Sequence, residues 1–194
     1  ILPANHKAGY ILQKDQWRAT GAAELNKMGA LERAFRKQNA IIGNNCNICS
    51  HCFIENNVKI GNNVTVKAGV YLWDGIEIED DVFIGPNVVF TNDIYPRSKQ
   101  FKEPATTKIQ KGVSLGANST ILAGTKLGAY SMTGIGSVVT RDLKSHGLYF
   151  GNPAKLQGWV DEDGNKLTYD AAKQLWISPN KSVFKEENTG LIKL

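Results

Sequence analysis

Large apolar residues recur at every sixth position through the middle of the chain. Nine consecutive members of this series are Ile42, Ile48, Ile54, Ile60, Val66, Leu72, Ile78, Ile84 and Phe90. An α-helix would repeat its apolar positions about every 3.6 residues, and an ordinary strand every second residue. A period of six instead indicates short strands joined by corners, with three such units completing one turn of a prism-shaped coil. The pattern therefore predicts an all-β solenoid of hexapeptide units.

Each unit has the same local order. An inward apolar residue is often followed by Gly, and a small or branched residue comes four places on, as in Ile60-Gly61-Asn62-Asn63-Val64 and Ile84-Gly85-Pro86-Asn87-Val88. The period stops after Phe90 and resumes at Ile109, Leu115, Ile121, Leu127 and Val139, with Thr133 in the single polar slot. Burial of one such side chain contributes roughly 1.5–3 kcal/mol, so stacked columns can hold a narrow core. The strands of a β-sandwich would not keep this register.

The period divides the chain into three parts. Residues 1–40 form an N-terminal extension, in which 21–39 carry apolar residues at near-helical spacing: Leu25, Met28, Leu31 and Phe35. With Thr20 as its N-cap, this segment is predicted to be a helix that covers the open first coil. Residues 41–150 are the solenoid. Residues 151–194 lose the period, and Asp163-Gly164-Asn165 indicates the turn of a hairpin in a small C-terminal β appendage.

A long insertion is expected to interrupt the solenoid at residues 93–108. It contains two prolines and lacks the six-residue pattern. A loop of this length within a compact repeat is typically functional. We therefore expect an arm that lies over a binding site or a neighbouring subunit.

Composition and charge limit the choice of partners. The chain has 194 residues, 42% of them hydrophobic, and a formal net charge of +5 at pH 7. Its Lys and Arg residues are spread out rather than gathered in a tract with interleaved aromatics, which argues against nucleic acid and favours a small phosphorylated ligand. The sequence predicts no membrane span, and its first residues lack the basic start and apolar run of a signal peptide. We expect a cytoplasmic protein with no membrane partner.

Three cysteines, Cys46, Cys49 and Cys52, follow the spacing C-x-x-C-x-x-C beside His51. Such spacing also occurs in zinc and iron–sulfur sites. The hexapeptide register offers a simpler explanation, because Cys46 and Cys52 take the small-residue slot that Val64 fills in a later unit. The thiols then lie on different faces or corners of one coil, too dispersed for a tetrahedral site. We expect reduced thiols and no metal.

Residues 18 apart should lie above one another in successive coils, and this groups polar side chains at one corner. The resulting columns are Glu55, Trp73 and Thr91; Asn56, Asp74 and Asn92; and Asn57, Gly75 and Asp93. Asn and Asp are common at tight corners for backbone reasons alone. Trp73 beside Asp74, where the insertion departs, instead suggests a substrate site in which an exposed indole stacks on a planar base or a sugar.

His51 is expected at the neighbouring corner, in the column of Gly69 and Asn87. Histidine is the side chain best suited to accept a proton near neutral pH, so His51 is the candidate general base of the solenoid. The alternative is a solvated turn residue. We expect His6 and His146 to be structural or surface groups.

Three stretches of the chain together resemble one family. They are C-N-I-C-S-H-C-F-I-E-N-N-V from residue 46, L-W-D-G-I-E-I-E-D-D-V-F-I-G-P-N-V-V-F-T-N-D-I-Y-P-R-S-K from residue 72, and G-N-P-A-K from residue 151. From about residue 41 to the end, the chain is similar to the left-handed β-helix hexapeptide acyltransferases. F-T-N-D-x-Y-P-R-S resembles the branch that N-acetylates dTDP-linked 3-amino-3,6-dideoxyhexoses, and the tail G-W-V-D-E-D-G-N-K-L fits that branch, whereas residues 1–40 depart from it.

The resemblance implies a left-handed parallel β-helix that forms a homotrimer, with acetyl-CoA bound in the clefts between subunits. It places the pantetheine arm along late coils and the nucleotide end near a basic residue, at Gly116, Ala117, Gly134, Ile135 and Lys155. It places the nucleotide sugar at the corner and the insertion, at Trp73, Asp74, Asn92, Asp93, Tyr95 and Arg97. The products of this branch enter glycans such as lipopolysaccharide O-antigens and S-layers.

The implied reaction is attack of the sugar's 3-amino group on the acetyl-CoA thioester. The amine must be neutral, and with a pKa near ~8 about a tenth of it is neutral at pH 7. Asn92 or Asp93 would orient the amine, and a backbone N–H near Gly116 or Gly134 would bind the oxyanion. Either His51 or the leaving thiolate would accept the proton.

Other functions stay open at this point. A UDP-linked 3-amino-uronic acid would share the phosphate contacts and differ in the contacts to the base and to C6. A γ-type carbonic anhydrase would need three His ligands, and His51 is the single histidine expected in the coils, because His146 follows the last coil. A non-catalytic hexapeptide solenoid would not bind acetyl-CoA. Gluco and galacto acceptors, and acyl groups of different length, are all compatible with the sequence.

Overall fold

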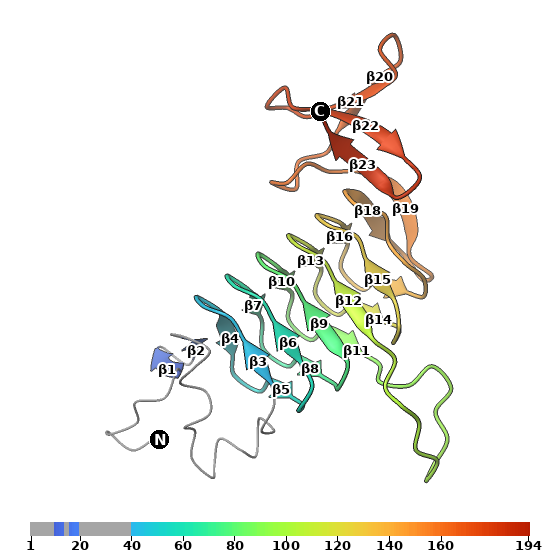
Figure 1. Ribbon diagram of the computed structural model, residues 1–194. Helices are drawn as coiled ribbons and strands as arrows, with labels where there is room; N and C mark the ends of the chain where they lie inside the picture. The colour runs from blue at the N-terminus through green and yellow to red at the C-terminus, as the bar shows by residue number, and fades with distance from the viewer. Residues whose placement is uncertain (1–9, 14–15, 20–39) are drawn as a thin grey trace.

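The computed structural model describes residues 10–13, 16–19 and 40–194, and the elements in these residues are β-strands. Short strands follow one another around a three-sided coil, and the coils stack along one axis (Figure 1). The register gives about six coils, so the all-β solenoid predicted from the six-residue period is confirmed. Its left-handed sense stays a prediction.

Three sheets form the faces of the solenoid. Sheet C contains β3 (Ile41–Ile42), β6 (Lys59–Ile60), β9 (Ile76–Ile78), β12 (Thr107–Ile109) and β15 (Lys126–Leu127). Sheet B contains β5 (Phe53–Ile54), β8 (Tyr71–Leu72), β11 (Val89–Phe90), β14 (Thr120–Ile121) and β17 (Val138–Val139). Sheet A contains β1 (Tyr10–Gln13), β2 (Gln16–Ala19), β4 (Asn47–Cys49), β7 (Thr65–Val66), β10 (Phe83–Ile84), β13 (Ser114–Leu115), β16 (Met132–Thr133), β18 (Gly147–Phe150) and β19 (Lys155–Trp159).

The register of the coils follows the sequence period. Ile42 pairs with Ile60 and Ile60 with Ile78, so successive coils are 18 residues apart. Ile78 then pairs with Ile109, which is 31 residues on and therefore 13 more than a regular coil. This excess is the insertion. Beyond it, Ile109 pairs with Leu127 and the 18-residue spacing returns.

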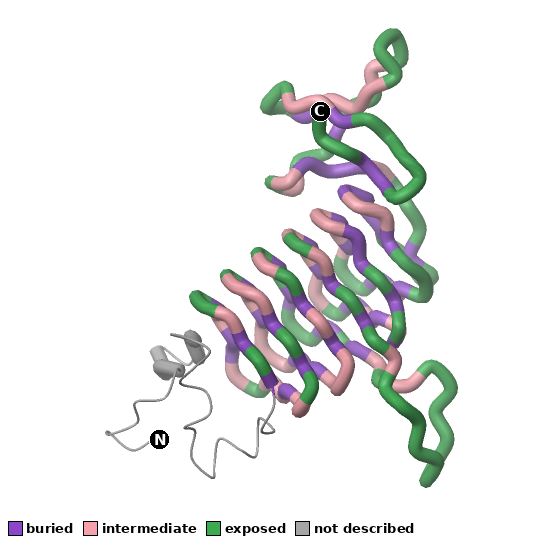
Figure 2. The backbone as a smooth tube through the Cα atoms, in the orientation of Figure 1, coloured by how far each residue is buried: buried purple, intermediate pink, exposed green. Residues whose placement is uncertain are grey.

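The core is a set of inward columns that run along the solenoid axis (Figure 2). In sheet A the column consists of Ile48, Val66, Ile84, Leu115, Thr133 and Tyr149. The polar member, Thr133, is buried, and its hydroxyl accepts a hydrogen bond from the Gly116 N–H (3.0 Å) and lies 3.2 Å from the Ser119 hydroxyl. A buried hydroxyl with partners is tolerated, which explains the one polar slot in the period.

The corners use the left-handed backbone region. Between sheets A and B, the residues with positive φ are His51, Gly69, Asn87, Asn118 and Gly136. Between sheets C and A, they are Asn45, Asn63, Asp81, Gly112, Tyr130 and His146. Gly, Asn and Asp adopt this conformation with least strain, so their recurrence at corners has a backbone cause.

The N-terminal end of the solenoid carries a hairpin that the sequence analysis did not predict. Strands β1 and β2 pair antiparallel, and β2 pairs antiparallel with β4 of the first coil. The hairpin therefore extends sheet A beyond the first coil. The helix predicted over 21–39 lies outside the described residues.

The other end carries a second, smaller sheet. Strands β20 (Thr168–Asp170), β21 (Leu175–Ile177), β22 (Val183–Glu187) and β23 (Gly190–Lys193) form an antiparallel sheet D. Its own core consists of Trp159, Leu167, Phe184 and Leu191, with Trp176 packed against it. The turn expected at 163–165 is present, since Val160 and Lys166 form an antiparallel bridge around it. The appendage is thus a four-stranded sheet rather than one hairpin.

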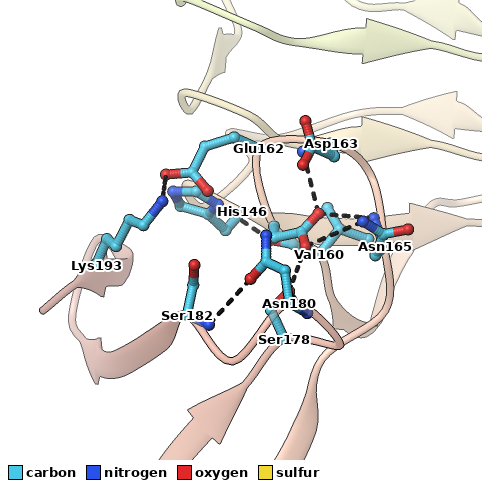
Figure 3. A network of polar contacts seen from close by, with 10 residues as sticks. His146, Val160, Glu162, Asp163, Asn165, Ser178, Asn180, Ser182 and Lys193 are labelled. Atoms are coloured by element: carbon cyan, nitrogen blue, oxygen red, sulfur yellow. Dashed lines mark hydrogen bonds and ion pairs between the residues drawn. The ribbon is translucent and has the colours of Figure 1, made fainter.

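A polar network joins the turn at 161–165 to sheet D (Figure 3). The carboxylate of Asp161 accepts hydrogen bonds from the Asp163 N–H (3.0 Å), from the backbone and side chain of Asn165, and from the Ser178 hydroxyl. Lys193 of β23 lies 3.0 Å from the Glu162 carboxylate.

In the described part of the chain, no helix is long and apolar enough to cross a membrane.

Candidate active site

The insertion leaves the solenoid at the corner between sheets B and C, called here the loop corner (residues 55–58, 73–75, 91–106 and 122–125). Strand β11 ends at Phe90 and β12 begins at Thr107, so the loop covers 91–106. The expected bounds of 93–108 were therefore shifted, because Thr107 and Lys108 belong to β12. The loop projects from the side of the solenoid and is almost entirely exposed (Figures 1 and 2).

Both stems of the loop are bonded to the following coil. The Thr91 N–H donates to the Ile121 carbonyl (3.0 Å), and the Thr91 hydroxyl accepts from the Ala123 N–H (2.8 Å). On the return stem, the buried Thr107 hydroxyl accepts from the Gly124 N–H (3.0 Å). Neither threonine was singled out as a stem residue from sequence, because spacing does not reveal which loop ends carry a hydroxyl partner.

Asn92 and Asp93 are the first residues beyond the outgoing stem. The Asp93 Oδ1 accepts a hydrogen bond from the Tyr95 N–H (2.8 Å), which closes a local turn. Lys102 approaches the same oxygen to 3.9 Å, donates to the Tyr95 carbonyl and lies over the Tyr95 ring at 5.9 Å from its centroid. Lys102 therefore places a positive charge beside Asp93, and the sequence analysis missed it.

Arg97 lies further out on the same loop. Its Nη1 donates to the Pro96 carbonyl over 2.9 Å, and the residue is exposed. A guanidinium on an exposed loop suits contact with a phosphate. The loop thus holds Asp93, Tyr95, Arg97 and Lys102 within one short segment.

The carboxylates beneath the loop are used to join coils. The Asp74 Oδ1 accepts from the Asn57 N–H (2.8 Å), and the Asp74 N–H donates to the Glu55 Oε2 (3.0 Å). Residues one coil apart at this corner therefore meet as the column argument predicted. Asp74 has a structural role at the loop corner whatever it does with a substrate.

The expectation of an exposed indole at Trp73 is wrong. Trp73 is partly buried against the core, and its Nε1–H donates to the Phe90 carbonyl over 2.7 Å. Its ring meets Phe53 at 5.7 Å and Tyr71 at 6.0 Å between centroids, the latter edge to face. The period correctly placed Trp73 at this corner. It does not specify in which direction the side chain points, because that depends on packing.

His51 lies at a different corner, the one between sheets A and B. It is exposed and has a φ of 59°. The same corner contains the predicted cofactor residues Gly116, Ala117, Gly134 and Ile135, which are stacked two coils deep. We call it the glycine corner (residues 49–52, 67–69, 85–87, 116–118 and 134–136).

Within one protomer, His51 is far from these late coils. Four coil steps separate the column positions of His51 and Gly136, and at about 4.8 Å per step the distance is roughly 19 Å. Asp93 lies at another corner of the prism. The structure therefore brings together the cofactor candidates with one another, and the loop residues with one another, but joins neither group to His51 in one chain.

The glycine corner is narrow because backbone packs on backbone. A Cβ at Gly116 would lie 2.6 Å from the Gly134 carbonyl carbon and 2.7 Å from the Ile135 nitrogen. Above it, Ile135 is 81% exposed and Phe150 is 42% exposed. Phe150 pairs with Lys155 in the β18–β19 hairpin, so Lys155 lies at the last-coil end of this corner. Phe150 was not predicted, since it follows the last regular unit.

The cysteines occupy separate positions in the first coil. The Cys46 thiol donates to the Gly61 carbonyl (3.1 Å), and the Cys52 thiol donates to the Lys67 carbonyl (3.2 Å). Burial raises the pKa of both thiols. Within the described ranges, no three His, Cys, Asp or Glu side chains come close enough to hold a metal ion.

Family comparisons agree with the architecture. Residues 57–92 match the family described as bacterial transferase hexapeptide (six repeats), and residues 39–73 and 106–141 match the hexapeptide repeat of succinyl-transferase. The matched coils, within 39–92 and 106–141, are similar to the hexapeptide repeats of bacterial transferases. The gap between the matched ranges, residues 93–105, lies within the loop.

Two relatives match parts of the chain. Over 63 residues, the chain is 60% identical to dTDP-3-amino-3,6-dideoxy-alpha-D-galactopyranose 3-N-acetyltransferase of Aneurinibacillus thermoaerophilus, covering 32% of this chain and 33% of that protein. Over 99 residues, it is 30% identical to galactoside O-acetyltransferase of Lactococcus lactis, covering 48% and 47%. The chain thus spans about a third to a half of the length of these relatives.

Solved structures share the fold. AntD, an N-acyltransferase from Bacillus cereus in complex with dTDP and coenzyme A, superposes with a TM-score of 0.58 at 21% identity, covering 66% of this chain and 77% of AntD. A hexapeptide-repeat acetyltransferase from Vibrio cholerae, complexed with acetyl coenzyme A, has a TM-score of 0.51 at 25% identity, covering 68% and 75%.

Proposed function

We propose that the chain is an acetyl-CoA-dependent N-acetyltransferase that acts on the 3-amino group of a dTDP-linked 3-amino-3,6-dideoxyhexose. The observation that carries this proposal is the 63-residue stretch that is 60% identical to a 3-N-acetyltransferase for such a sugar. The polar loop at 91–106 supports it, because it supplies a carboxylate for an amine and cations for phosphates.

The active unit is proposed to be a homotrimer of parallel solenoids. Asp93 and the glycine corner lie at different corners of one prism, so they do not adjoin in the described part of one chain. Two copies side by side can bring the loop corner of one against the glycine corner of the next. Acetyl-CoA would then lie along Gly116, Ala117, Gly134 and Ile135, with Lys155 near its nucleotide end.

In this arrangement the sugar nucleotide lies under the loop. Asn92 and Asp93 orient the amine, and Tyr95 and Arg97 contact the nucleotide. The packed indole of Trp73 and the Asn57-bonded carboxylate of Asp74 are supports of this site rather than ligand contacts. A rigid scaffold that positions a loop is a common way to hold reactive groups in place.

The chemistry is an acyl transfer without a protein acyl intermediate. The neutral amine forms a C–N bond to the thioester carbonyl carbon, giving a tetrahedral oxyanion that a backbone N–H at the glycine corner can bind. The C–S bond then breaks and coenzyme A leaves as a thiolate. The nitrogen gives up one proton, either to that thiolate or to His51 of an adjacent copy, and the products are the N-acetyl sugar and coenzyme A.

The proposed setting is the cytoplasm, where acetyl-CoA and nucleotide sugars are both available, and the proposed use is in O-antigen or S-layer glycans. The acceptor class is tested by thiol release from acetyl-CoA with dTDP-3-amino-3,6-dideoxyglucose, its galacto epimer and a UDP-linked 3-amino-uronic acid. Turnover of a dTDP sugar supports the proposal. Turnover of the UDP-linked acceptor alone would identify that sugar as the acceptor instead. No thiol release with any of the three would reject the proposed activity.

The role of the loop carboxylate is tested with Asp93→Asn. Loss of the charge that holds the amine should lower kcat by about 10²-fold or more. Asp163→Asn, an exposed carboxylate in the C-terminal turn, is the matched control and should retain activity. His51→Asn keeps a residue that tolerates the corner backbone, and its kcat separates the two proton acceptors: a fall of at least 10²-fold assigns the proton to His51, and an unchanged value assigns it to the thiolate.

A further inference from the structure

The contact between β8 and β11 at the loop corner differs from the contacts above and below it. One coil down, the Glu55 N–H donates to the Leu72 carbonyl (2.9 Å), and one coil up, the Thr91 N–H donates to the Ile121 carbonyl (3.0 Å). At the rung between them, the indole Nε1–H of Trp73 donates to the Phe90 carbonyl at 2.7 Å. A side chain therefore binds the last carbonyl before the loop.

Trp73 is itself held firmly. Its ring forms a three-ring cluster with Phe53 and Tyr71, at interplanar angles of 54° and 89°, and it packs on the hydrophobic core. The hydrogen bond to Phe90 and the aromatic cluster together fix the orientation of this indole. The position suits a support for the backbone.

The next residue is held from the opposite side. Thr91 bonds to the following coil through its N–H and through its hydroxyl, which accepts from the Ala123 N–H. Phe90 and Thr91 are thus fixed by the coil below through Trp73 and by the coil above through Ala123. Asn92 and Asp93 leave the solenoid directly after this doubly held pair.

The return stem is tied at the same level. The Thr107 N–H donates to the Gly75 carbonyl (3.1 Å), and its hydroxyl accepts from the Gly124 N–H. Ala105 of the loop packs between the two glycines: a Cβ at Gly75 would lie 3.3 Å from the Ala105 carbonyl, and one at Gly124 3.3 Å from the Ala105 Cβ. The remaining freedom of the outgoing stem therefore depends on Trp73 and Thr91.

We propose that Trp73 is a positioning residue, which fixes the exit of the loop and so sets the place and direction of Asn92 and Asp93. The effect on catalysis rests on the acetyl transfer proposed above, whereas the effect on the loop does not. Trp73 acts through the backbone of Phe90 and does not touch the substrate.

The test compares Trp73→Phe with Trp176→Phe in the full chain. Both variants keep an aromatic ring and lose one indole N–H, and Trp176 donates to Glu186 in sheet D, far from the loop in sequence and in the fold. Amide hydrogen exchange is followed in peptides from 91–106, together with kcat and the two KM values. For Trp73→Phe we expect at least tenfold faster exchange in 91–95, about tenfold lower kcat, and KM values within twofold of wild type.

The outcomes separate the proposals. Unchanged exchange in Trp73→Phe overturns the positioning role, and so does a raised KM for the sugar nucleotide with an unchanged kcat, since that result identifies a ligand-stacking surface. Faster loop exchange in a protein with no turnover of any acceptor retains the positioning role and rejects only the proposed function. Trp176→Phe should match wild type in the loop.

A second variant covers the case in which Trp73→Phe does not fold. Thr91→Val keeps the shape of the side chain and removes the acceptor for the Ala123 N–H. It should speed exchange in 91–95 and lower kcat in the same way, while Thr120→Val, also in sheet B, should change neither. If the exchange rates of 91–95 in Thr91→Val equalled those of wild type, the fixing of the outgoing stem from both sides would be overturned.

Discussion

The Nδ1–H of His146 donates a hydrogen bond to the Val160 carbonyl over 3.0 Å, at the point where sheet D meets the last coil. The ring is stacked on Tyr130 at 5.1 Å and meets the edge of Phe184 at 5.1 Å. Glu162, Asp161 and Lys193 are the charged groups that act on it, and Glu162 and Lys193 lie beside the ring in Figure 3. His146 therefore lies as a buried neutral ring between the solenoid and the C-terminal sheet.

This position predicts a loss of stability on mild acidification. Burial is the main cause that lowers the pKa of His146 below its ordinary value, although Val160, Glu162 and Asp161 act in the opposite direction. The unfolded chain then binds the proton more readily than the folded one. Stability should be fully present above the unfolded pKa of about 6.5 and should fall as the pH drops below it toward the folded value.

The measurement is urea unfolding of wild type and His146→Asn between pH 7.5 and pH 5. Asn tolerates the left-handed backbone at this position, where φ is 62°. In His146→Asn, the unfolding free energy should depend less steeply on pH than in wild type. Equal slopes in the two proteins would contradict the assignment to His146.

Much of the solenoid could be predicted because the inward position is a matter of counting. Ile42, Ile60 and Ile78 are 18 apart in sequence and pair in space. The loop was found for the same reason, since the count fails after Phe90. A strand unit that must bury one side chain per face leaves little freedom in register.

The parts that were missed are those that the period does not encode. The direction of Trp73 depends on its packing against Phe53 and Tyr71, and the positions of the loop stems depend on the hydroxyls of Thr91 and Thr107. The β1–β2 hairpin and sheet D lie outside the repeat, where short strands give weak patterns. The separation of His51 from Asp93 could not be predicted either, because it depends on how the three corners are arranged in space.

Asp161 should contribute strongly to the stability of the C-terminal sheet. It is 1% exposed. Burial alone would raise its pKa, but the hydrogen bonds from Ser178, Asn165 and the Asp163 N–H outweigh this and lower it. Asp161→Asn replaces one carboxylate oxygen, which accepts hydrogen bonds, with an NH₂ group that would face the same N–H and O–H donors. The substitution should lower the unfolding free energy by about 2 kcal/mol.

Asp163→Asn provides the comparison for Asp161→Asn. Asp163 is exposed and enters the network through its backbone N–H. The substitution should change the unfolding free energy by less than about 0.5 kcal/mol. If the two variants had the same urea midpoint, the side-chain network would not be a source of stability.

The first-coil thiols should be inert in the folded protein. Burial raises the pKa of Cys46 and Cys52, and the thiolate is the reactive form. Both should react slowly with a disulfide reagent at pH 7.5 and rapidly in urea. Cys46→Val and Cys52→Val should each retain stability within about 1 kcal/mol, because Val64 and Val70 fill the same slot one coil on. Unfolding of both variants together with loss of bound zinc would instead identify a metal site.

Gly116→Ala should be disruptive for a steric reason. Its new Cβ would lie 2.6–2.7 Å from backbone atoms of Thr133, Gly134 and Ile135, and none of these can yield without moving a coil. We expect a loss of about 1–3 kcal/mol in unfolding free energy. Weaker acetyl-CoA binding, measured by calorimetry, should follow if the pantetheine arm runs along this corner.

Gly136→Ala, at the same corner, isolates the steric effect at Gly116. Its Cβ would meet nothing within 4 Å, but its φ of +67° strains an L-residue, at about 1–2 kcal/mol. Acetyl-CoA affinity relative to folded protein should therefore fall in Gly116→Ala more than in Gly136→Ala. A Gly116→Ala protein with wild-type stability would show that the coils can separate at the glycine corner, and the narrow backbone contact there would no longer explain why glycine recurs at 85, 116 and 134.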